Sequence, residues 1–380
     1  MARSRSSRLA VLSVAGSLSA TMAILPSTPG GAESRNDEGA KVTNCNVAGR
    51  GSLADAVAGA RSGSTITITA SCSSDNPITP ADVIPIDTSL TIKASRSERA
   101  VISGGTTHSI FTVAPGAVVS LEGLTLRDGS STSYALGQAG GAIHSDGTLN
   151  LTNDVFVNNV GIFGGAVTTT GPLTVDRCTF GAGFAFIGSS IVATGANVRI
   201  SNSEISDNQA IIGTLLTLGG SLTVRHSVVT RNVAHGIYGG IVAIGNFQDP
   251  VNSLTVSDST ISNNQGGDFG GGVFTSDGMA ATIERSTIAN NTAIDGAGID
   301  NSNATLTIRD SVFSGNSAIG AGGAIRSWGD NAAVNVESSR FFNNAGESLP
   351  TKYPGIYIFS GTLKVRGSTF GSPRDGSRDR

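Results

Sequence analysis

The chain contains few charged and few aromatic residues. Only 14% of its 380 residues are Asp, Glu, Lys or Arg, and 5% are Phe, Trp or Tyr. The 25 basic and 28 acidic residues are scattered without long runs, so no electrostatic footprint for nucleic acid is visible. We therefore expect no nucleic-acid partner.

Cysteine and histidine are also scarce, with 3 and 4 residues. No Cys and His cluster has zinc-ligand spacing, and no cofactor is expected beyond the calcium considered below. Glycine, in contrast, is abundant at 51 residues, beside a hydrophobic content of 38%. This balance favours a turn-rich β architecture with a sizeable core.

The N-terminal residues have the layout of a secretory signal peptide. Arginines precede an apolar, small-residue stretch at 9–25, and prolines follow it. Cleavage after Ala23 or after Ala32 satisfies the small-residue preference, and we assign residues 1–32 to the signal peptide. The alternative is a retained membrane anchor, for which the stretch is short, because a span needs ~20 apolar residues. We expect a secreted, periplasmic or cell-surface protein whose mature chain does not span the membrane.

An oxidising exterior permits a disulfide between Cys45 and Cys72, which would tie the N-terminal region to the first turns of the core. Between them, Ser52 and Asp55 have the spacing of a helix-capping box. A short helix there would cover the open first coil, which is an edge that invites aggregation. We assign residues 33–63 to a linker and this capping helix.

One segment recurs from the middle of the chain to its end. Its unit reads apolar, x, apolar, x, x, Ser, x, Phe or Ile, x, x, Asn. The units start at Leu149, Leu173, Val198, Leu222, Leu254, Ala281, Leu306, Val334 and Leu363. The two apolar positions alternate with polar residues at the period of two that a strand requires, and the Phe or Ile position adds an inward column beyond a bend. We predict a parallel β-solenoid over residues 64–372, with at least two strands per coil, and a polar tail at 373–380.

The Asn and Ser positions are interpreted as structural. The Asn column comprises Asn159, Asn208, Asn232, Asn264, Asn291, Asn316 and Asn344. Asn tolerates left-handed backbone and can bridge to the same amide in the next coil, so a continuous amide ladder is expected. Cys178 occupies the Ser position of one unit, where a small buried residue fits, and we interpret it as a core residue rather than a reactive thiol.

A segment that begins with glycine follows the Asn position in several coils. These segments are 140–143, 164–167, 270–273, 296–299 and 322–325. Glycine permits a tight corner and close contact between successive coils. A phosphate-binding loop is the alternative, and it fails because no helix follows these glycines.

These motifs resemble two groups of exported proteins. GGAI or GGAV with a following F-x-x-N, as at 156–159 and 313–316, resembles the repeats of polymorphic outer membrane proteins. GSLADAV at 51–57, followed by STITI, looks like the N-terminal entry of the pectate-lyase-like β-helix superfamily. The resemblances cover residues 45–371 and imply an all-β, right-handed parallel β-helix. The first also implies a surface-exposed adhesin carried by a C-terminal barrel. The chain ends at Arg380 without room for that barrel, so we expect a released or periplasmic protein.

Polysaccharide-cleaving relatives of this fold use one of two residue sets. The polygalacturonase-like set of aspartates with Gly-His-Gly and Arg-Ile-Lys motifs is absent, because the nearest approach is Ala-His-Gly at 234–236. The lyase-like set pairs calcium-binding carboxylates with a basic proton abstractor, and its positions must be judged from the coil register.

Four charged residues flank the glycine corners of adjacent coils. Asp268 and Asp295 precede a corner, while Asp300 and Arg326 each follow one by one position. Two carboxylates at coil-stacking distance repel, which raises one pKa or recruits a cation such as calcium, and Asp277 could add a ligand. Asp268 and Asp295 would then be the acid and base pair or calcium ligands, and Arg326 the substrate-binding or catalytic cation. The alternative is a solvated ladder with Asp300 and Arg326 as a surface pair.

Carbohydrate recognition without catalysis needs exposed aromatic side chains beside polar groups. Candidates are Tyr238, Phe247, Asp249 and Trp328 on or near the corner loops. The longest unit, 222–253, holds the first three, and insertions on solenoids often mark the binding face. Packing of one loop over its neighbour explains the same aromatic residues equally well.

Two hypotheses follow from these observations. The first is a non-catalytic, adhesin-like β-helix that binds extracellular polysaccharide or another cell-surface component. The second is a polysaccharide lyase or glycoside hydrolase. They differ on whether Asp268, Asp295, Asp300 and Arg326 converge in a groove with room for a sugar.

Overall fold

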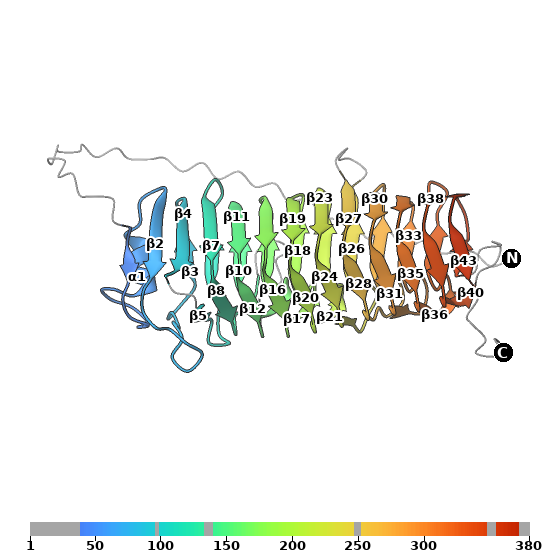
Figure 1. Cartoon of the computed structure of the whole chain (residues 1–380). Helices are drawn as coiled ribbons and strands as arrows, with labels where there is room; N and C mark the ends of the chain where they lie inside the picture. The colour runs from blue at the N-terminus through green and yellow to red at the C-terminus, as the bar shows by residue number, and fades with distance from the viewer. Residues whose placement is uncertain (1–38, 96–98, 133–139, 247–251, 348–354, 372–380) are drawn as a thin grey trace, which may run out of the picture. The chain divides into compact units, whose positions relative to one another are not determined.

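The computed structural model describes residues 39–95, 99–132, 140–246, 252–347 and 355–371. Residues 1–32, which are predicted to be a signal peptide, and the predicted tail 373–380 lie outside this part of the chain. The predicted parallel β-solenoid is confirmed, because successive coils pair through parallel strands in every sheet (Figure 1). Among the described residues, no helix is long and apolar enough to cross a membrane.

Each coil passes through sheets that we call C, A, B and D, in that order. Sheet A consists of β1 (Lys41–Val42), β2 (Ser64–Ile68), β4 (Leu90–Ala94), β7 (Val118–Glu122), β11 (Thr148–Thr152), β15 (Leu173–Asp176), β19 (Asn197–Ser201), β23 (Ser221–Arg225), β27 (Ser253–Ser257), β30 (Ala280–Glu284), β34 (Thr305–Arg309), β38 (Ala333–Glu337) and β42 (Thr362–Arg366). Sheet B consists of β5 (Ala100–Ser103), β8 (Leu124–Arg127), β12 (Val155–Val157), β16 (Thr179–Gly181), β20 (Glu204–Ser206), β24 (Val228–Thr230), β28 (Thr260–Ser262), β31 (Thr287–Ala289), β35 (Val312–Ser314), β39 (Arg340–Phe342) and β43 (Thr369–Gly371).

The other two sheets complete the coil. Sheet C consists of β3 (Ile84–Ile86), β6 (Phe111–Val113), β10 (Ile143–Ser145), β14 (Val167–Thr169), β18 (Ile191–Thr194), β22 (Leu215–Leu218), β26 (Ile241–Ile244), β29 (Val273–Ser276), β33 (Ile299–Ser302), β37 (Ile325–Trp328) and β41 (Ile356–Ile358). Sheet D has two parts, β9 (Ser130–Ser131), β13 (Val160–Phe163), β17 (Phe184–Ile187), β21 (Gln209–Ile212) and β25 (Val233–Ala234), then β32 (Thr292–Ala293), β36 (Ser317–Ala321) and β40 (Ala345–Glu347). Most coils therefore have more strands than the two that the repeat predicts as a minimum.

The sequence repeat coincides with the sheet register. All the predicted unit starts, from Leu149 to Leu363, are Cα partners in sheet A. The Phe or Ile position lies inside the coil at sheet B, where the rings of Phe156 and Phe180 stack with centroids 4.6 Å apart. Burying this column in every coil builds one continuous core, which is the main stabilising term of a solenoid.

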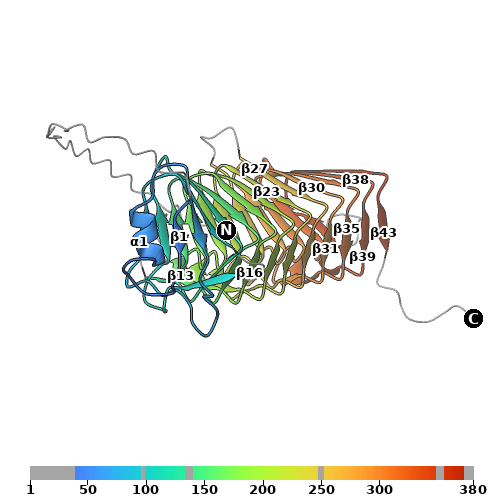
Figure 2. The ribbon, with the colours of Figure 1, turned by 60° about the vertical axis from the view of Figure 1, so that its left-hand side comes forward.

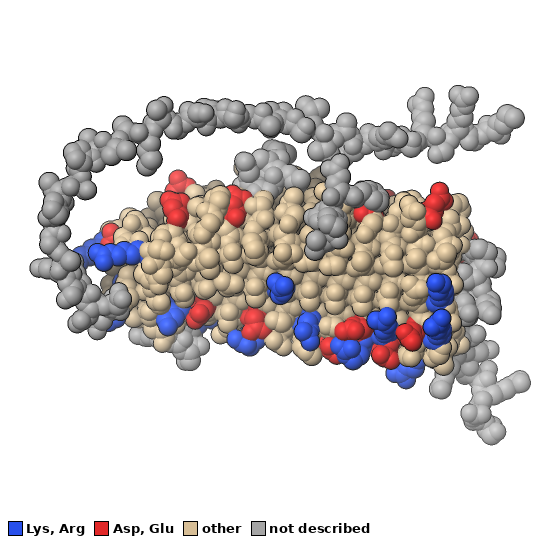
Figure 3. All heavy atoms as spheres, turned by 90° about the horizontal axis from the view of Figure 1, so that it is seen from above, with Lys and Arg blue, Asp and Glu red and all other residues tan. Residues whose placement is uncertain are grey.

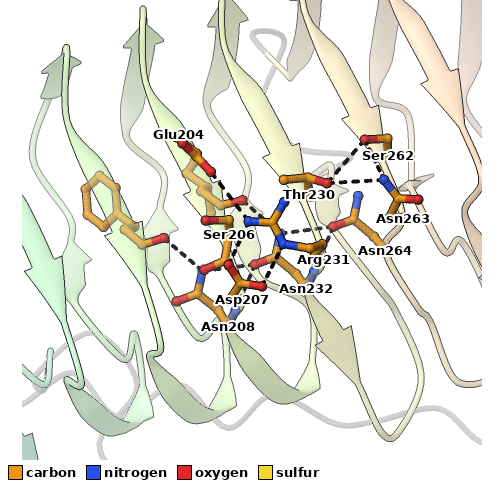
Figure 4. A network of polar contacts seen from close by, with 12 residues as sticks. Glu204, Ser206, Asp207, Asn208, Thr230, Arg231, Asn232, Ser262, Asn263 and Asn264 are labelled. Atoms are coloured by element: carbon orange, nitrogen blue, oxygen red, sulfur yellow. Dashed lines mark hydrogen bonds and ion pairs between the residues drawn. The ribbon is translucent and has the colours of Figure 1, made fainter.

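The Asn position forms the predicted ladder. The Asn232 Nδ2 donates to Asn264 Oδ1 at 2.9 Å (Figure 4). In the next coil, Asn264 Nδ2 donates to Asn291 Oδ1 at 3.1 Å. The expectation that these Asn residues adopt left-handed backbone is wrong. The positive φ falls one residue earlier, as at Arg231 (55°) and Asn263 (56°), because the chain must turn there for the next side chain to point inward.

The Ser position forms a second ladder. Each hydroxyl accepts a hydrogen bond from the backbone N–H of the Ser in the preceding coil, as Ser227 Oγ does from Ser203 N at 3.1 Å. Cys178 lies in this ladder and is 1% exposed, which agrees with the predicted core role. One coil earlier the position is occupied by Asp154, a fully buried carboxylate that the repeat analysis did not identify.

The N-terminal region closes the first coil. The predicted helix is confirmed as α1 (Leu53–Ala58), whose N-cap Ser52 accepts a hydrogen bond from Asp55 N, and its Leu53 and Val57 are buried (Figure 2). The predicted disulfide is present between Cys45 and Cys72. The linker expected at 33–63 contains an additional strand, since β1 pairs with β2 and extends sheet A.

Candidate functional site

The outer face of sheet C changes character along the solenoid. The middle residue of each strand points away from the core, because its neighbours on both sides face inward. Register places in one outward column Thr112, His144, Thr168, Val192, Leu216, Val242, Phe274, Asp300, Arg326 and Tyr357. The column is polar at first, apolar over four coils, charged at Asp300 and Arg326, and ends at Tyr357.

A second row of side chains comes from the turn that joins sheet D to sheet C. In this row Tyr238 pairs with Phe269 and Phe269 pairs with Asp295 in successive coils. The turn approaches the outward column closely, because a Cβ on Gly296 would lie 2.7 Å from the Cβ of Asp300. Gly296 also has a φ of 60°, so glycine is required here for both space and conformation.

The apolar part of the column and the turn form one cluster outside the main core. Val192, Leu216, Val242 and Phe274 are buried there, although they point away from the solenoid interior. The Tyr238 ring stacks on Phe274 with centroids 3.9 Å apart, and Phe269 lies beside it at 6.4 Å. The result is an apolar strip that ends in aromatic rings, and we call it the aromatic strip.

A charged network adjoins the aromatic strip. The Arg326 Nη1 lies 3.2 Å from Asp295 Oδ2 and 3.0 Å from Asp300 Oδ2. Its guanidinium carbon also lies 4.9 Å from the centroid of the Phe269 ring and 5.5 Å from that of Trp328, so the cation is held over two aromatic rings. We call Asp295, Asp300, Arg326 and Trp328 the Arg326 network.

Hydrogen bonds use most of the carboxylate oxygens in this network. Trp328 Nε1 donates to Asp300 Oδ1 at 2.9 Å, and Ala321 N donates to Asp295 Oδ1 at 2.7 Å. Asp300 is 0% exposed, and this burial raises its pKa to about 7 against the opposing effect of Arg326. Burial, followed by the charges of nearby aspartates, also raises the pKa of Tyr238.

The structure therefore brings together three of the four predicted catalytic residues. Asp295, Asp300 and Arg326 are in contact, with Trp328 added from the predicted substrate-binding set. Asp268, the fourth, is exposed and lies one residue before Phe269. It is linked to the network through its backbone, because its C=O accepts a hydrogen bond from Asp295 N. The alternative of a solvated surface pair is wrong for Asp300 and Arg326, because the glycine corner and the aromatic rings exclude solvent from the carboxylate.

Of the other predicted substrate-binding residues, one lies in the aromatic strip and two lie outside the described residues. Tyr238 is half-buried in the aromatic strip, while Phe247 and Asp249 lie outside the described residues. The predicted calcium ligands Asp268 and Asp295 lie on adjacent coils. Within the described residues, no group of three or more His, Cys, Asp or Glu side chains could hold a metal ion.

Phe274 is the site residue that sequence reasoning did not identify. It follows its glycine corner by one position, as Asp300 and Arg326 do in the next two coils. The same register that related Asp300 to Arg326 therefore contained the signal for Phe274.

Comparison with known proteins agrees with the architecture. A family model described as a right handed beta helix region matches residues 239–376. The structure itself is a right-handed parallel β-helix. No curated protein matches the sequence.

One solved structure with a similar fold is a mannuronic acid specific polysaccharide family 6 lyase enzyme from human gut microbiota. It is 9% identical, with a TM-score of 0.29, and the match covers 80% of this chain and 87% of that chain. At this identity and TM-score, the likeness says nothing about the activity of the present chain.

Proposed function

We propose that this protein is exported and binds polysaccharide along the outer face of sheet C, without cleaving it. The Cys45–Cys72 disulfide supports export, because such bonds persist in oxidising compartments. The observation that carries the proposal is the aromatic strip, which continues directly into the Arg326 network.

The combination suits a sugar chain for physical reasons. Ligand sites are mostly apolar surfaces with a few fixed polar groups that set orientation. Tyr238, Phe269 and Trp328 are each half-buried, so part of every ring is accessible next to polar atoms. Because carboxylates outnumber the single guanidinium in this region, the site favours uncharged sugar units over acidic ones.

The arrangement favours binding over cleavage. Asp300 is fully buried and accepts hydrogen bonds from Arg326 and Trp328, so its carboxylate holds these two side chains in place. Arg326 forms ion pairs with two carboxylates, so its guanidinium is already engaged, which opposes a role as a proton abstractor.

A polysaccharide lyase or glycoside hydrolase is the second candidate. It is favoured by the pKa of Asp300, which burial raises to about 7, close to the value that suits a general acid at neutral pH. In this alternative Asp268 or Asp295 would be the second carboxylate of an acid and base pair.

One screen tests both candidates. The purified protein is tested against neutral and acidic polysaccharides, with and without calcium, and binding, reducing ends and unsaturated-product absorbance are recorded together. We expect binding without product, and Tyr238→Ala or Trp328→Ala should weaken it about tenfold, because each substitution removes aromatic contact area.

Phe186→Ala is the matched control, since this phenylalanine is 54% exposed on sheet D and belongs neither to the aromatic strip nor to the Arg326 network. Equal losses in Phe186→Ala and Tyr238→Ala would show that the aromatic strip is not the binding surface. Product formation that Asp295→Asn abolishes would replace the binding proposal with the enzyme candidate.

A further inference from the structure

The outer face of sheet A has a depression near the C-terminal end of the described solenoid. It lies over β34, β38 and β42, has a volume of about 270 Å³, and is lined by Thr307, Arg309, Asn335, Val336, Glu337, Lys364 and Arg366. Register places Thr307, Asn335 and Lys364 in one outward column and Arg309, Glu337 and Arg366 in the next. We call this surface the basic depression.

The basic depression is lined by more cationic than acidic side chains. Arg309 Nε lies 3.5 Å from Glu337 Oε2, with both side chains more than half exposed. Within the part of the chain that the structure describes, neither Lys364 nor Arg366 forms a salt bridge. Three cationic side chains therefore share one carboxylate, and the depression has an excess of positive charge.

Arg231 and Arg285, which lie on earlier coils, are each paired with carboxylates. Arg231 donates to both oxygens of Asp207 at 2.8 Å (Figure 4), and Arg285 donates to Asp258 and Glu284. Charged side chains gather along one edge of the molecule, while most of the same face is uncharged (Figure 3). Unpaired positive charge in a hollow thus distinguishes the basic depression from the surroundings of Arg231 and Arg285.

We propose that the basic depression binds the carboxylate of an acidic sugar unit in a polysaccharide. Lys364 and Arg366 supply the charge, and the exposed face of a β-strand places them about 7 Å apart, which is wide enough for one carboxylate to lie between the two side chains. Thr307 and Asn335 line the same hollow with a hydroxyl and an amide, which hydrogen-bond to sugar hydroxyls. This site does not depend on the proposed function of sheet C, where Arg326 is neutralised by two aspartates.

The test uses polygalacturonate oligosaccharides as the acidic probe and dextran as the neutral one, with calorimetric titration of the full chain. We expect the acidic probe to bind and the double variant Lys364→Gln/Arg366→Gln to weaken binding at least about tenfold, because exposed charges contribute modestly and additively. High salt should weaken the wild-type complex in the same direction.

Two variants serve as controls. Arg231→Gln and Arg285→Gln each remove a paired arginine from the solenoid surface and should leave the affinity for polygalacturonate unchanged. No binding of the acidic probe, a salt-independent affinity, or an equal loss in Arg231→Gln would overturn the proposal. A loss in Tyr238→Ala alone would place the acidic sugar on sheet C instead. Loss of dextran binding in Tyr238→Ala would support the proposed neutral-sugar site on sheet C, and it does not bear on the basic depression.

Discussion

Replacing Asp154 with serine should stabilise the protein at neutral and alkaline pH. Asp154 occupies a position of the Ser ladder, where it accepts hydrogen bonds from Leu124 N at 2.8 Å and from Thr152 N at 3.1 Å. It is 0% exposed, and burial raises its pKa from 3.8 to about 7 despite these two bonds. A serine hydroxyl can keep the bond from Leu124 N without a charge, as it does elsewhere in the ladder.

The sign and size of the effect follow from proton linkage. Because the folded protein binds this proton more tightly than the unfolded chain, the stabilising contribution is complete below pH ~4 and is lost as the pH rises through ~7. A shift of about three pKa units corresponds to at most about 4 kcal/mol, since one unit is worth ~1.4 kcal/mol. Asp154→Ser should therefore raise the free energy of unfolding by about 1–4 kcal/mol at pH 8 and leave it nearly unchanged at pH 4.

Urea denaturation of both proteins across this pH range measures the difference directly. Asp300 has a similarly raised pKa, but it is present in both proteins and cancels in the comparison. Asp258→Ser is the control, because its Arg285 partner lowers the pKa of Asp258 and the substitution should give no gain at pH 8. A stability difference for Asp154→Ser that does not change with pH would refute the argument that Asp154 carries a buried, titrating charge.

Three further predictions concern the core. Cys45→Ser/Cys72→Ser should lower the free energy of unfolding by about 3.5 kcal/mol, as expected for a 27-residue loop, which denaturation under identical oxidising conditions checks. Cys178 should not react with thiol reagents until the protein unfolds, because burial raises its pKa to about 12, and timed labelling with and without urea tests this. Asn264→Ala should cost at least about 2 kcal/mol by leaving ladder groups unpaired, whereas Asn263→Gly at the adjacent left-handed position should be nearly neutral by the same denaturation assay.

The sequence was sufficient to predict the fold because inward positions repeat. An inward side chain must fit against the same position of the coils above and below, so Leu, Val, Ile, Phe, Ser and Asn recur at fixed offsets and the register can be read directly. The strands of sheet D could not be predicted in this way. Their outward residues include Phe184 and Phe186, which are about half exposed and follow no repeating pattern.

The sequence predicts several residues of the candidate site, but it does not predict how deeply they are buried or what surrounds them. Register alone placed Asp300 next to Arg326 on adjacent coils. Burial could not be predicted, because it depends on how closely the turn at Gly296 approaches and on where the Phe269 and Trp328 rings lie. These are contacts between outward side chains of different coils, and each depends on a conformation that the repeat does not constrain.

This division between inward and outward positions also explains where function can reside in such a solenoid. The column that contains Asp300 and Arg326 holds Thr, Val and Leu in earlier coils, although all these residues share one backbone geometry. Substitution in the column changes the surface without changing the core, because the side chain points away from it. The backbone therefore acts as a fixed frame, and in this column each coil contributes one outward residue that can change. A ligand that lies across several coils would contact the exposed positions of that column in turn. Variants such as Tyr357→Thr, at a partly exposed position of the column, should alter ligand preference while leaving the unfolding transition nearly unchanged.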